Sequence, residues 1–328
     1  MKQCSLKIVT AFAITVFSIS VRAQTCQSGD EIPGQIRGAM ESMAQKTFDQ
    51  ATFGDLDALR ASLAPAAQSA FDGIAAAVKD NKAVFAGANH EVRISFLLDT
   101  GATPTADGRF YCGVFGASGA TGNSAEFDIP GLAAGKYGIV IQDLRGSKGP
   151  YALTTIFQEA NGWKLAGFYV RPESALGHDG LWYLARARDF KSRGQTHNAW
   201  FYYVTSWDLM APVTFMDTKL LSKITQESNS AQPSDIPISG NAVNYSANGK
   251  TYKITDMSVY RTEKSFDLNV KYASPGNTDY NASVAEARSL ANALAAQYPE
   301  LKEAFNNLWV HAIDPNGGDA VGLVSLKQ

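Results

Sequence analysis

The spacing of apolar residues changes several times along this chain of 328 residues, and these changes constrain its fold more than any other feature. Between about residues 32 and 85, apolar residues recur every three or four positions, as at Ile36, Met40 and Met43, which predicts two or three amphipathic helices. From about residue 92 to 170, short alternating runs are separated by Gly, Pro, Asn and Asp, which predicts strands. Helices followed by such strands favour an α+β fold.

The strand-like stretch divides into five runs. Its clearest turn is Asn161-Gly162, because both residues accept positive φ at low cost in a hairpin. Between Gly116 and Gly135 the sequence is longer and richer in glycine than a simple hairpin requires, so the middle of the sheet has no definite predicted order. The expected strands of this antiparallel sheet are residues 92–98, 109–115, 137–142, 151–158 and 163–170.

The last hairpin of this stretch carries a family resemblance. After the predicted helices and a meander, the polar turn is followed by a Trp-Lys-Leu sequence that begins at Trp163, and then by further aromatic residues. This arrangement, over about residues 30 to 172, resembles the nuclear transport factor two-like superfamily. The resemblance implies a cone-like domain, in which helices pack on a curved antiparallel sheet. The same cone hosts isomerases, dehydratases, binding modules and dimerisation domains, so the resemblance selects no activity.

Four residues of the predicted cone are candidates for lining a ligand pocket. In catalytic members of the superfamily that the chain resembles, an acid, a histidine or a tyrosine lies inside the cavity, where burial shifts its pKa toward neutrality. None of the four stands in a recognisable motif: a solvated turn also explains His90, and turn chemistry explains Asp99. No catalytic residue is therefore assigned. The candidates are His90, Asp99, Tyr111 and Asp143.

Trp163 is expected to be structural. It follows the hairpin turn and alternates with Leu165, Gly167 and Tyr169, which predicts that these residues share the buried face of the sheet. We therefore expect Trp163 to anchor the last hairpin against the helices.

Residues 174–230 return to helical spacing and are rich in aromatic residues, which predicts a helical hairpin that connects two domains. Ala187, Gly194 and Ala199 stand in the order and spacing of a single tetratricopeptide repeat, which the hairpin resembles in degenerate form. An aromatic stripe at helical spacing is more often core than a ligand site. The aromatic residues are Trp182, Tyr183, Phe190, Trp200, Phe201, Tyr202, Tyr203 and Trp207.

A linker is predicted at residues 231–240, where Pro, Ser and Asn accumulate. The remaining sequence predicts a compact α+β domain of no recognised family. Its helix is expected to begin at a capping box formed by Ser283 and Glu286. The expected order is a cone-like domain at residues 24–173, a helical connector at 174–230, the linker, and a C-terminal α+β domain at 241–328.

The first 23 residues predict a signal peptide. Lys2 and Lys7 precede an uncharged, largely apolar run at residues 8–21, and small residues predict a cut after Ala23. The run is short for a membrane span, so a retained anchor is the less favoured alternative. A lipoprotein is disfavoured because no small apolar residues directly precede Cys26. We therefore expect a periplasmic or secreted protein with no stable membrane span.

Removal of this segment leaves Cys26 and Cys112, an even number for an oxidising compartment. We predict that they form a disulfide, with two separate thiols as the alternative, because spacing does not show proximity. Loss of Lys2, Lys7 and Arg22 also changes the formal net charge from −2 to −5. A mildly acidic chain without a dense Lys/Arg cluster does not favour nucleic-acid binding. Two cysteines and four scattered histidines do not support a metal site.

The sequence favours a protein without catalytic activity. It contains no serine elbow, zinc-binding helix, phosphate-binding loop or dinucleotide motif, and we expect no cofactor. We predict an exported binding or assembly protein of the bacterial envelope, whose partner is a small molecule or an envelope protein. One alternative is a cavity enzyme of lyase or isomerase type in the cone. The other is a structural scaffold that docks a protein through the aromatic helical hairpin.

Overall fold

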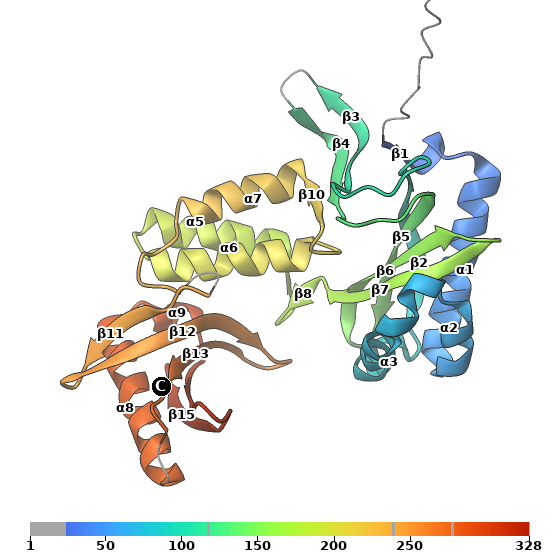
Figure 1. Ribbon diagram of the computed structural model, residues 1–328. Helices are drawn as coiled ribbons and strands as arrows, with labels where there is room; N and C mark the ends of the chain where they lie inside the picture. The colour runs from blue at the N-terminus through green and yellow to red at the C-terminus, as the bar shows by residue number, and fades with distance from the viewer. Residues whose placement is uncertain (1–23, 117–118, 238–239, 277–278, 328) are drawn as a thin grey trace, which may run out of the picture.

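The computed structural model describes residues 24–116, 119–237, 240–276 and 279–327, and the predicted signal peptide lies outside this part of the chain. The predicted α+β class is confirmed, with helices and antiparallel sheets in comparable amounts. The cone-like curvature of the first sheet stays a prediction. We describe an N-terminal unit, residues 24–179, and a C-terminal unit that begins at residue 180 (Figure 1).

The helices predicted before the first sheet are present. The longest ends where Gly54 adopts a φ of 69°, a conformation that glycine tolerates best. Its buried stripe includes Met40, Ala44 and Phe48, which follow the predicted spacing. The helical segments are α1 (Gly34–Phe53), α2 (Leu56–Ser62), α3 (Phe71–Asp80) and α4 (Lys82–Phe85), with short 3-10 turns η1 at Gly29–Glu31 and η2 at Pro65–Ala70.

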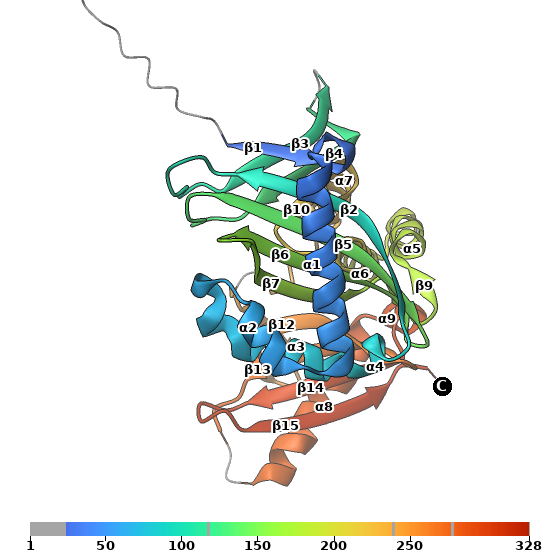
Figure 2. The same ribbon diagram turned by 90° about the vertical axis from the view of Figure 1, so that its right-hand side faces the viewer.

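Five antiparallel strands form the N-terminal sheet in the order β1-β2-β5-β6-β7. The predicted hairpin between β6 and β7 is confirmed, since Asn161 and Gly162 have φ values of 53° and 100°. Figure 2 shows α1 crossing one face of this sheet. The strands are β1 (Thr25–Ser28), β2 (Asn89–Asp99), β5 (Lys136–Gly146), β6 (Gly149–Glu159) and β7 (Trp163–Pro172).

A second, three-stranded sheet covers the other face of the N-terminal sheet. It has the order β10-β4-β3 and contains β3 (Arg109–Gly116), β4 (Gly119–Asp128) and β10 (Met216–Thr218). Strand β4 therefore lies within the glycine-rich segment for which no order was predicted. The cluster between the two sheets includes Phe96, Phe127 and Ile139, each at most 2% exposed, so the N-terminal sheet is buried on both faces.

Cys26 on β1 and Cys112 on β3 form a disulfide, with their Cα atoms 4.9 Å apart. The predicted pairing is therefore confirmed. Cys112 is fully buried between the two sheets. The bridge attaches the edge strand of the N-terminal sheet to the layer that covers it.

The predicted helical hairpin opens the C-terminal unit as α5 (Gly180–Ser192) and α6 (Thr196–Met210), followed by α7 (Lys219–Asn229). Gly194, in the turn between α5 and α6, has a φ of 76°. Ala187 and Ala199 are both fully buried, which fits the close approach of two helices through small residues. In Figure 1 these helices lie beside the β3–β4 hairpin on one side and the C-terminal sheet on the other.

The C-terminal sheet has five strands in the order β11-β12-β13-β14-β15, and β13 and β14 are parallel to each other. The crossover between them contains α8 (Tyr280–Gln297) and α9 (Leu301–Ala304). The predicted capping box is wrong: α8 begins one turn earlier, where Asp279 accepts the N–H groups of Asn281 and Ala282. The strands are β11 (Val243–Ala247), β12 (Lys250–Arg261), β13 (Phe266–Ala273), β14 (Asn307–Ile313) and β15 (Asp319–Ser325).

The aromatic helices and the C-terminal sheet share one hydrophobic cluster. Tyr202 packs edge-on against Phe266 of β13, with their ring centroids 5.3 Å apart. Ala231 and Ile236, in the segment predicted as a linker, are also buried in this cluster. The helices α5 to α7 are therefore packed with the C-terminal sheet as one unit.

Candidate ligand-binding cleft

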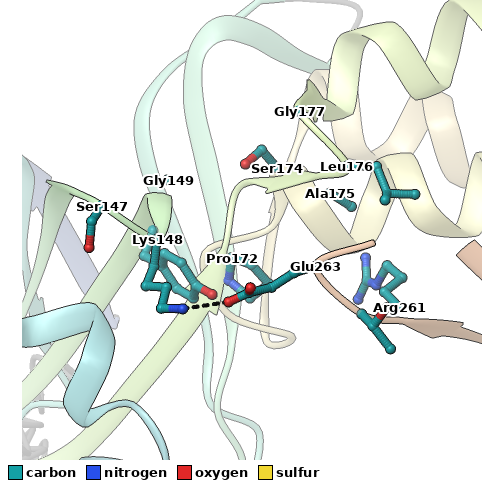
Figure 3. Close-up of a pocket in the computed structure, with 12 residues that line it drawn as sticks. Ser147, Lys148, Gly149, Pro172, Ser174, Ala175, Leu176, Gly177, Arg261 and Glu263 are labelled. Atoms are coloured by element: carbon teal, nitrogen blue, oxygen red, sulfur yellow. Dashed lines mark hydrogen bonds and ion pairs between the residues drawn. The ribbon is translucent and has the colours of Figure 1, made fainter. Parts of the chain in front are cut away.

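A cavity lies where the two units meet (Figure 3), and its volume is about 830 Å³. We call it the junction cleft. Its walls come from three segments: the β5–β6 turn, the segment that follows β7, and the end of β12 with the turn after it. The lining residues are Ser147, Lys148, Gly149, Tyr151, Pro172, Ser174, Ala175, Leu176, Gly177, Arg261, Thr262 and Glu263.

One wall of the junction cleft is a small hairpin of β8 (Ser174–Ala175) and β9 (His178–Asp179). Its turn contains Leu176, which has a φ of 51°. This left-handed conformation costs a residue with a Cβ atom roughly 1–2 kcal/mol. The stacking of His178 on Trp182, at 3.8 Å between ring centroids, helps to hold the hairpin in place. The surrounding packing thus keeps a leucine in an unfavourable conformation at the cleft wall.

The mouth of the junction cleft is bridged by an ion pair between the two units. Lys148 Nζ in the β5–β6 turn lies 2.5 Å from Glu263 Oε1 in the β12–β13 turn. The hydrogen bond and charge of Lys148 lower the pKa of Glu263, and Glu263 raises the pKa of Lys148 in turn. Because both side chains are exposed to solvent, this pair contributes little to stability.

At the cleft, the lining residue Arg261 shares one carboxylate with a second arginine, Arg171. Arg171 of β7 binds Asp208 Oδ1 and, at 3.1 Å, the Asp208 backbone oxygen, whereas Arg261 of β12 binds Asp208 Oδ2. Asp208 lies on α6, so this cluster joins three elements from both units. Arg171 Nε and Arg261 Nη1 are buried without a hydrogen-bond partner among the described residues. The cluster therefore has more buried donors than acceptors.

Tyr183 supports the wall from the side of the helices. Its hydroxyl donates a 3.2 Å hydrogen bond to the backbone oxygen of Ala175. Burial raises the pKa of Tyr183 to about 12, although the positive charge of Arg261 acts in the opposite direction. Tyr183 is therefore a neutral donor at physiological pH and fixes β8 against α5.

Hydroxyl groups give the cleft further donors. Thr262 Oγ1 accepts the N–H groups of Lys264 and Ser265, at 3.2 and 2.9 Å, so its own proton is available to an acceptor in the cleft. Within the described part of the chain, the hydroxyls of the lining residues Ser147 and Ser174 make no hydrogen bond. This arrangement can bind a polar molecule by hydrogen bonds.

The lining residues offer hydroxyl, ammonium, guanidinium and carboxylate groups. Among the described residues that line the cleft there is no histidine or cysteine, and its one carboxylate is paired with Lys148. Across the described ranges as a whole, no three His, Cys, Asp or Glu residues are placed to hold a metal ion. A nucleophile with an adjacent base, which covalent catalysis requires, is not assembled by these lining residues.

Two of the predicted pocket residues lie on paired strands of the N-terminal sheet. The ring of His90 packs 4.1 Å from the ring of Phe48, and its Nδ1 lies 3.0 Å from the amide nitrogen of Gln142. Asp143 follows Gln142, so it points to the opposite face, where it accepts a 2.6 Å hydrogen bond from Arg93 Nε. His90 and Asp143 therefore face different environments, and neither lines the junction cleft.

The other two predicted pocket residues lie elsewhere. Asp99, at the end of β2, accepts the N–H of Gly101 at 2.8 Å, which is the expected turn chemistry. Tyr111 on β3 is 53% exposed and interacts with Arg109. The four candidates do not converge on one cavity, and their role as pocket residues stays a prediction.

Trp163 is partly buried and packs on the helix-facing cluster of the N-terminal sheet, as does Leu165. The predicted alternation beyond Leu165 is wrong, because a β-bulge opposite Ile156 and Phe157 shifts the register. Gly167 pairs with Ile156, and Tyr169 contacts Phe215 on the other face. After the bulge, the residues of β7 therefore point to the opposite faces of the sheet from those that strict alternation predicts.

Most aromatic residues of the helical hairpin are core residues. Tyr183, Phe190, Phe201, Tyr202 and Tyr203 are at most 6% exposed. Trp182, Trp200 and Trp207 are partly buried against the same cluster. The stripe is thus used for packing within the C-terminal unit.

Comparisons with family models, curated proteins and solved structures found no match for this chain. The resemblance to the nuclear transport factor two-like superfamily therefore stays a prediction. Of the helices in the described ranges, none combines the length and apolar character needed to cross a membrane.

The cleft residues had no motif to mark them. Lys148 and Glu263 are 115 positions apart, and Arg261 ends a strand whose sequence alternates like its neighbours. The one local hint is the Ser147-Lys148-Gly149 turn between two predicted strands. Such a turn is common at hairpins, so it does not by itself indicate a site.

Proposed function

We propose that this protein is an exported, non-catalytic binding protein that holds a small ligand in the junction cleft. The observation that carries the proposal is a cavity of about 830 Å³ with walls from both units. Ligand pockets in proteins have volumes of roughly 300 to 1,000 Å³ and combine apolar surface with a few placed polar groups. Tyr151, Pro172 and Leu176 supply apolar surface, and the hydroxyls and Arg261 supply polar groups.

Export is supported by two features. The leading segment has the order of a signal peptide, and the Cys26–Cys112 disulfide suits an oxidising compartment. A binding role without chemistry is supported by the lining residues, which hold no nucleophile beside a base.

The two alternatives receive less support. A cavity enzyme would need space inside the predicted cone, but side chains such as Val140, Leu153 and Phe157 are fully buried on the helix-facing side of the N-terminal sheet. A scaffold that docks a partner through the aromatic hairpin would need these rings at the surface, but five of them are core residues.

The proposal is tested by native mass spectrometry of the purified protein and of a blocked variant. Ser147→Trp adds a large side chain to an exposed turn at the cleft mouth without disturbing the core. Ser192→Trp, at the exposed end of α5, is the matched control. We expect a copurified small molecule in the wild type and in Ser192→Trp, at an occupancy at least tenfold lower in Ser147→Trp. Equal occupancy in all three proteins would place the ligand elsewhere and overturn the proposal.

A further inference from the structure

We infer that the junction cleft recognises an anionic group, a carboxylate or a phosphate, and that Arg261 is the residue that binds it. This inference rests on the proposed function and adds the chemical class of the ligand. It follows from a count of hydrogen-bond donors and acceptors and from the balance of charge around the cleft.

The two arginines carry more N–H donors than their shared carboxylate can accept. A guanidinium carries five N–H donors and no acceptor, so Arg171 and Arg261 bring ten donors to the single carboxylate of Asp208. Each arginine has a nitrogen that is buried without a partner among the described residues. Buried donors without acceptors are costly, and proteins rarely leave them so without a functional reason. Arg261 Nη1 is buried and does not itself open to the cleft, but the side chain of Arg261 is 25% exposed and lines the cleft, where an anion would accept from its accessible N–H groups.

The charge balance points to the same class. Lys148, Arg171 and Arg261 are opposed by Asp208 and Glu263, which leaves one net positive charge around the cleft. The nearby carboxylate of Glu173 is already bound by Arg93. A positive site in a chain whose formal net charge is −2 favours an anionic ligand over a neutral one.

Geometry identifies Arg261 as the binding residue. Its side chain is 25% exposed and one of its edges is held by Asp208 Oδ2, so the guanidinium is oriented before a ligand arrives. Arginine binds carboxylate and phosphate through paired N–H groups, which a lysine ammonium does not reproduce. The proton of Thr262 and the free hydroxyl of Ser174 lie on the same cleft and can complete the contacts.

The test is isothermal titration of the full mature protein with succinate, inorganic phosphate and the neutral analogue succinamide. We expect one of the two anions to bind, and succinamide to bind at least tenfold more weakly than succinate or not at all. Binding of succinate would identify the anionic group as a carboxylate, and binding of inorganic phosphate would identify it as a phosphate. Binding of succinamide as tight as that of succinate, or no binding of either anion, would overturn the inference.

The residue is tested with three variants. Arg261→Gln is expected to weaken the bound anion at least tenfold, and Arg261→Lys, which keeps the charge, is expected to weaken it severalfold. Arg288→Gln removes the same charge from the exposed surface of α8 and should leave affinity unchanged. If Arg261→Gln does not fold, Arg261→Lys still tests the role of Arg261. Wild-type affinity in Arg261→Lys would show that the paired N–H groups of the guanidinium are not needed and would overturn that role.

The outcome for the ligand class is separable from the outcome for the cleft. A neutral molecule that is copurified and displaced by Ser147→Trp would keep the binding function and overturn the anion class. An anion that binds equally well to wild type and to Ser147→Trp would bind outside the cleft and overturn the inference as stated.

Discussion

The two five-stranded sheets of this protein differ in how many faces are covered. In the N-terminal sheet, the consecutive residues Ile139, Val140 and Ile141 are at most 1% exposed, because helices cover one face and the β3–β4 hairpin covers the other. In the C-terminal sheet, Leu308 and Val310 of β14 are fully buried, but Trp309 between them is only partly buried. A strand in a sheet that is covered on both faces thus has a continuous run of buried apolar residues. A strand in a sheet with one covered face has buried residues only at every second position.

The open face of the C-terminal sheet is stabilised differently. Trp309 lies on it and donates a 2.9 Å hydrogen bond from Nε1 to Asp267 Oδ2. Asp267 is only 2% exposed and also accepts the backbone N–H and the amide of Asn307. Hydrogen bonds to a buried carboxylate therefore stabilise this face, whereas apolar packing stabilises both faces of the N-terminal sheet.

The largest expected effect concerns the disulfide, which only the N-terminal unit contains. The double substitution Cys26→Ser and Cys112→Ser opens a loop whose ends are 86 residues apart. We expect it to lower the free energy of unfolding by roughly 4 to 5 kcal/mol, because the unfolded chain regains the entropy of that loop. Urea unfolding of wild type and variant measures the loss, and a change below about 1 kcal/mol would show that the bridge is not what joins the two layers.

A matched pair of substitutions tests the difference between the sheets directly. Phe157→Ala removes a fully buried side chain from the N-terminal sheet and should cost about 3 to 5 kcal/mol. Leu323→Ala shortens a side chain that is 38% exposed on the open face of the C-terminal sheet and should cost less than about 1 kcal/mol. Chemical denaturation of both variants is the measurement. If Leu323→Ala cost as much as Phe157→Ala, the open face would be covered in solution.

Trp163→Ala is expected to have an intermediate effect. Full burial would give a loss of about 3 to 5 kcal/mol, but Trp163 is only partly buried, so we expect roughly 2 to 3 kcal/mol. The melting temperature should fall while binding in the junction cleft is retained, since Trp163 is not among the lining residues. A variant that melted like the wild type and yet lost its ligand would contradict the structural role.

The smallest expected effect is a pH dependence in the C-terminal unit. Burial raises the pKa of Asp235, but hydrogen bonds from Tyr298, at 2.5 Å, and from His197, at 2.9 Å, lower it overall. The pKa of Asp235 is lower in the folded protein than in the unfolded chain, where it is about 3.9. Asp235 therefore stabilises the protein at a pH above about 3.9, and this contribution is lost as the pH falls through the lower pKa of the folded state.

The side chain of Asp235 is 43% exposed, so solvent screening limits the effect to less than about 1 kcal/mol. Between pH 5 and pH 3, the free energy of unfolding should therefore fall slightly less in Asp235→Asn than in the wild type. Denaturation curves across this range compare the two proteins. A steeper loss in the variant would reverse the sign of the proposed contribution.

Local patterns were enough to predict most elements but not their contacts. The helices and the hairpin turn at Asn161 follow from periodicity and from residues that accept positive φ. Strand β4 escaped prediction because Gly119 and Gly122 and small polar residues give it no alternation, and β1 because it has only four residues. The bulge in β7 depends on its partner strand, which a single segment does not reveal.

The candidate site could not be predicted from local sequence patterns, and the reason is physical. The Lys148–Glu263 and Arg171–Asp208–Arg261 contacts join segments that are far apart in the chain, and each residue alone resembles an ordinary surface charge. Only the packing of the two units brings them to one cleft.

Strand β10 has a consequence for how the two units can be separated. It comes after α6 in the chain, yet it pairs with β4 of the N-terminal unit, and Val213 and Met216 complete the cluster around Phe127. The units are therefore interlocked by a donated strand rather than merely adjacent. A gene truncated after residue 179 would encode a β3–β4 hairpin with an unpaired edge and an uncovered apolar patch, the features that make a fragment aggregate.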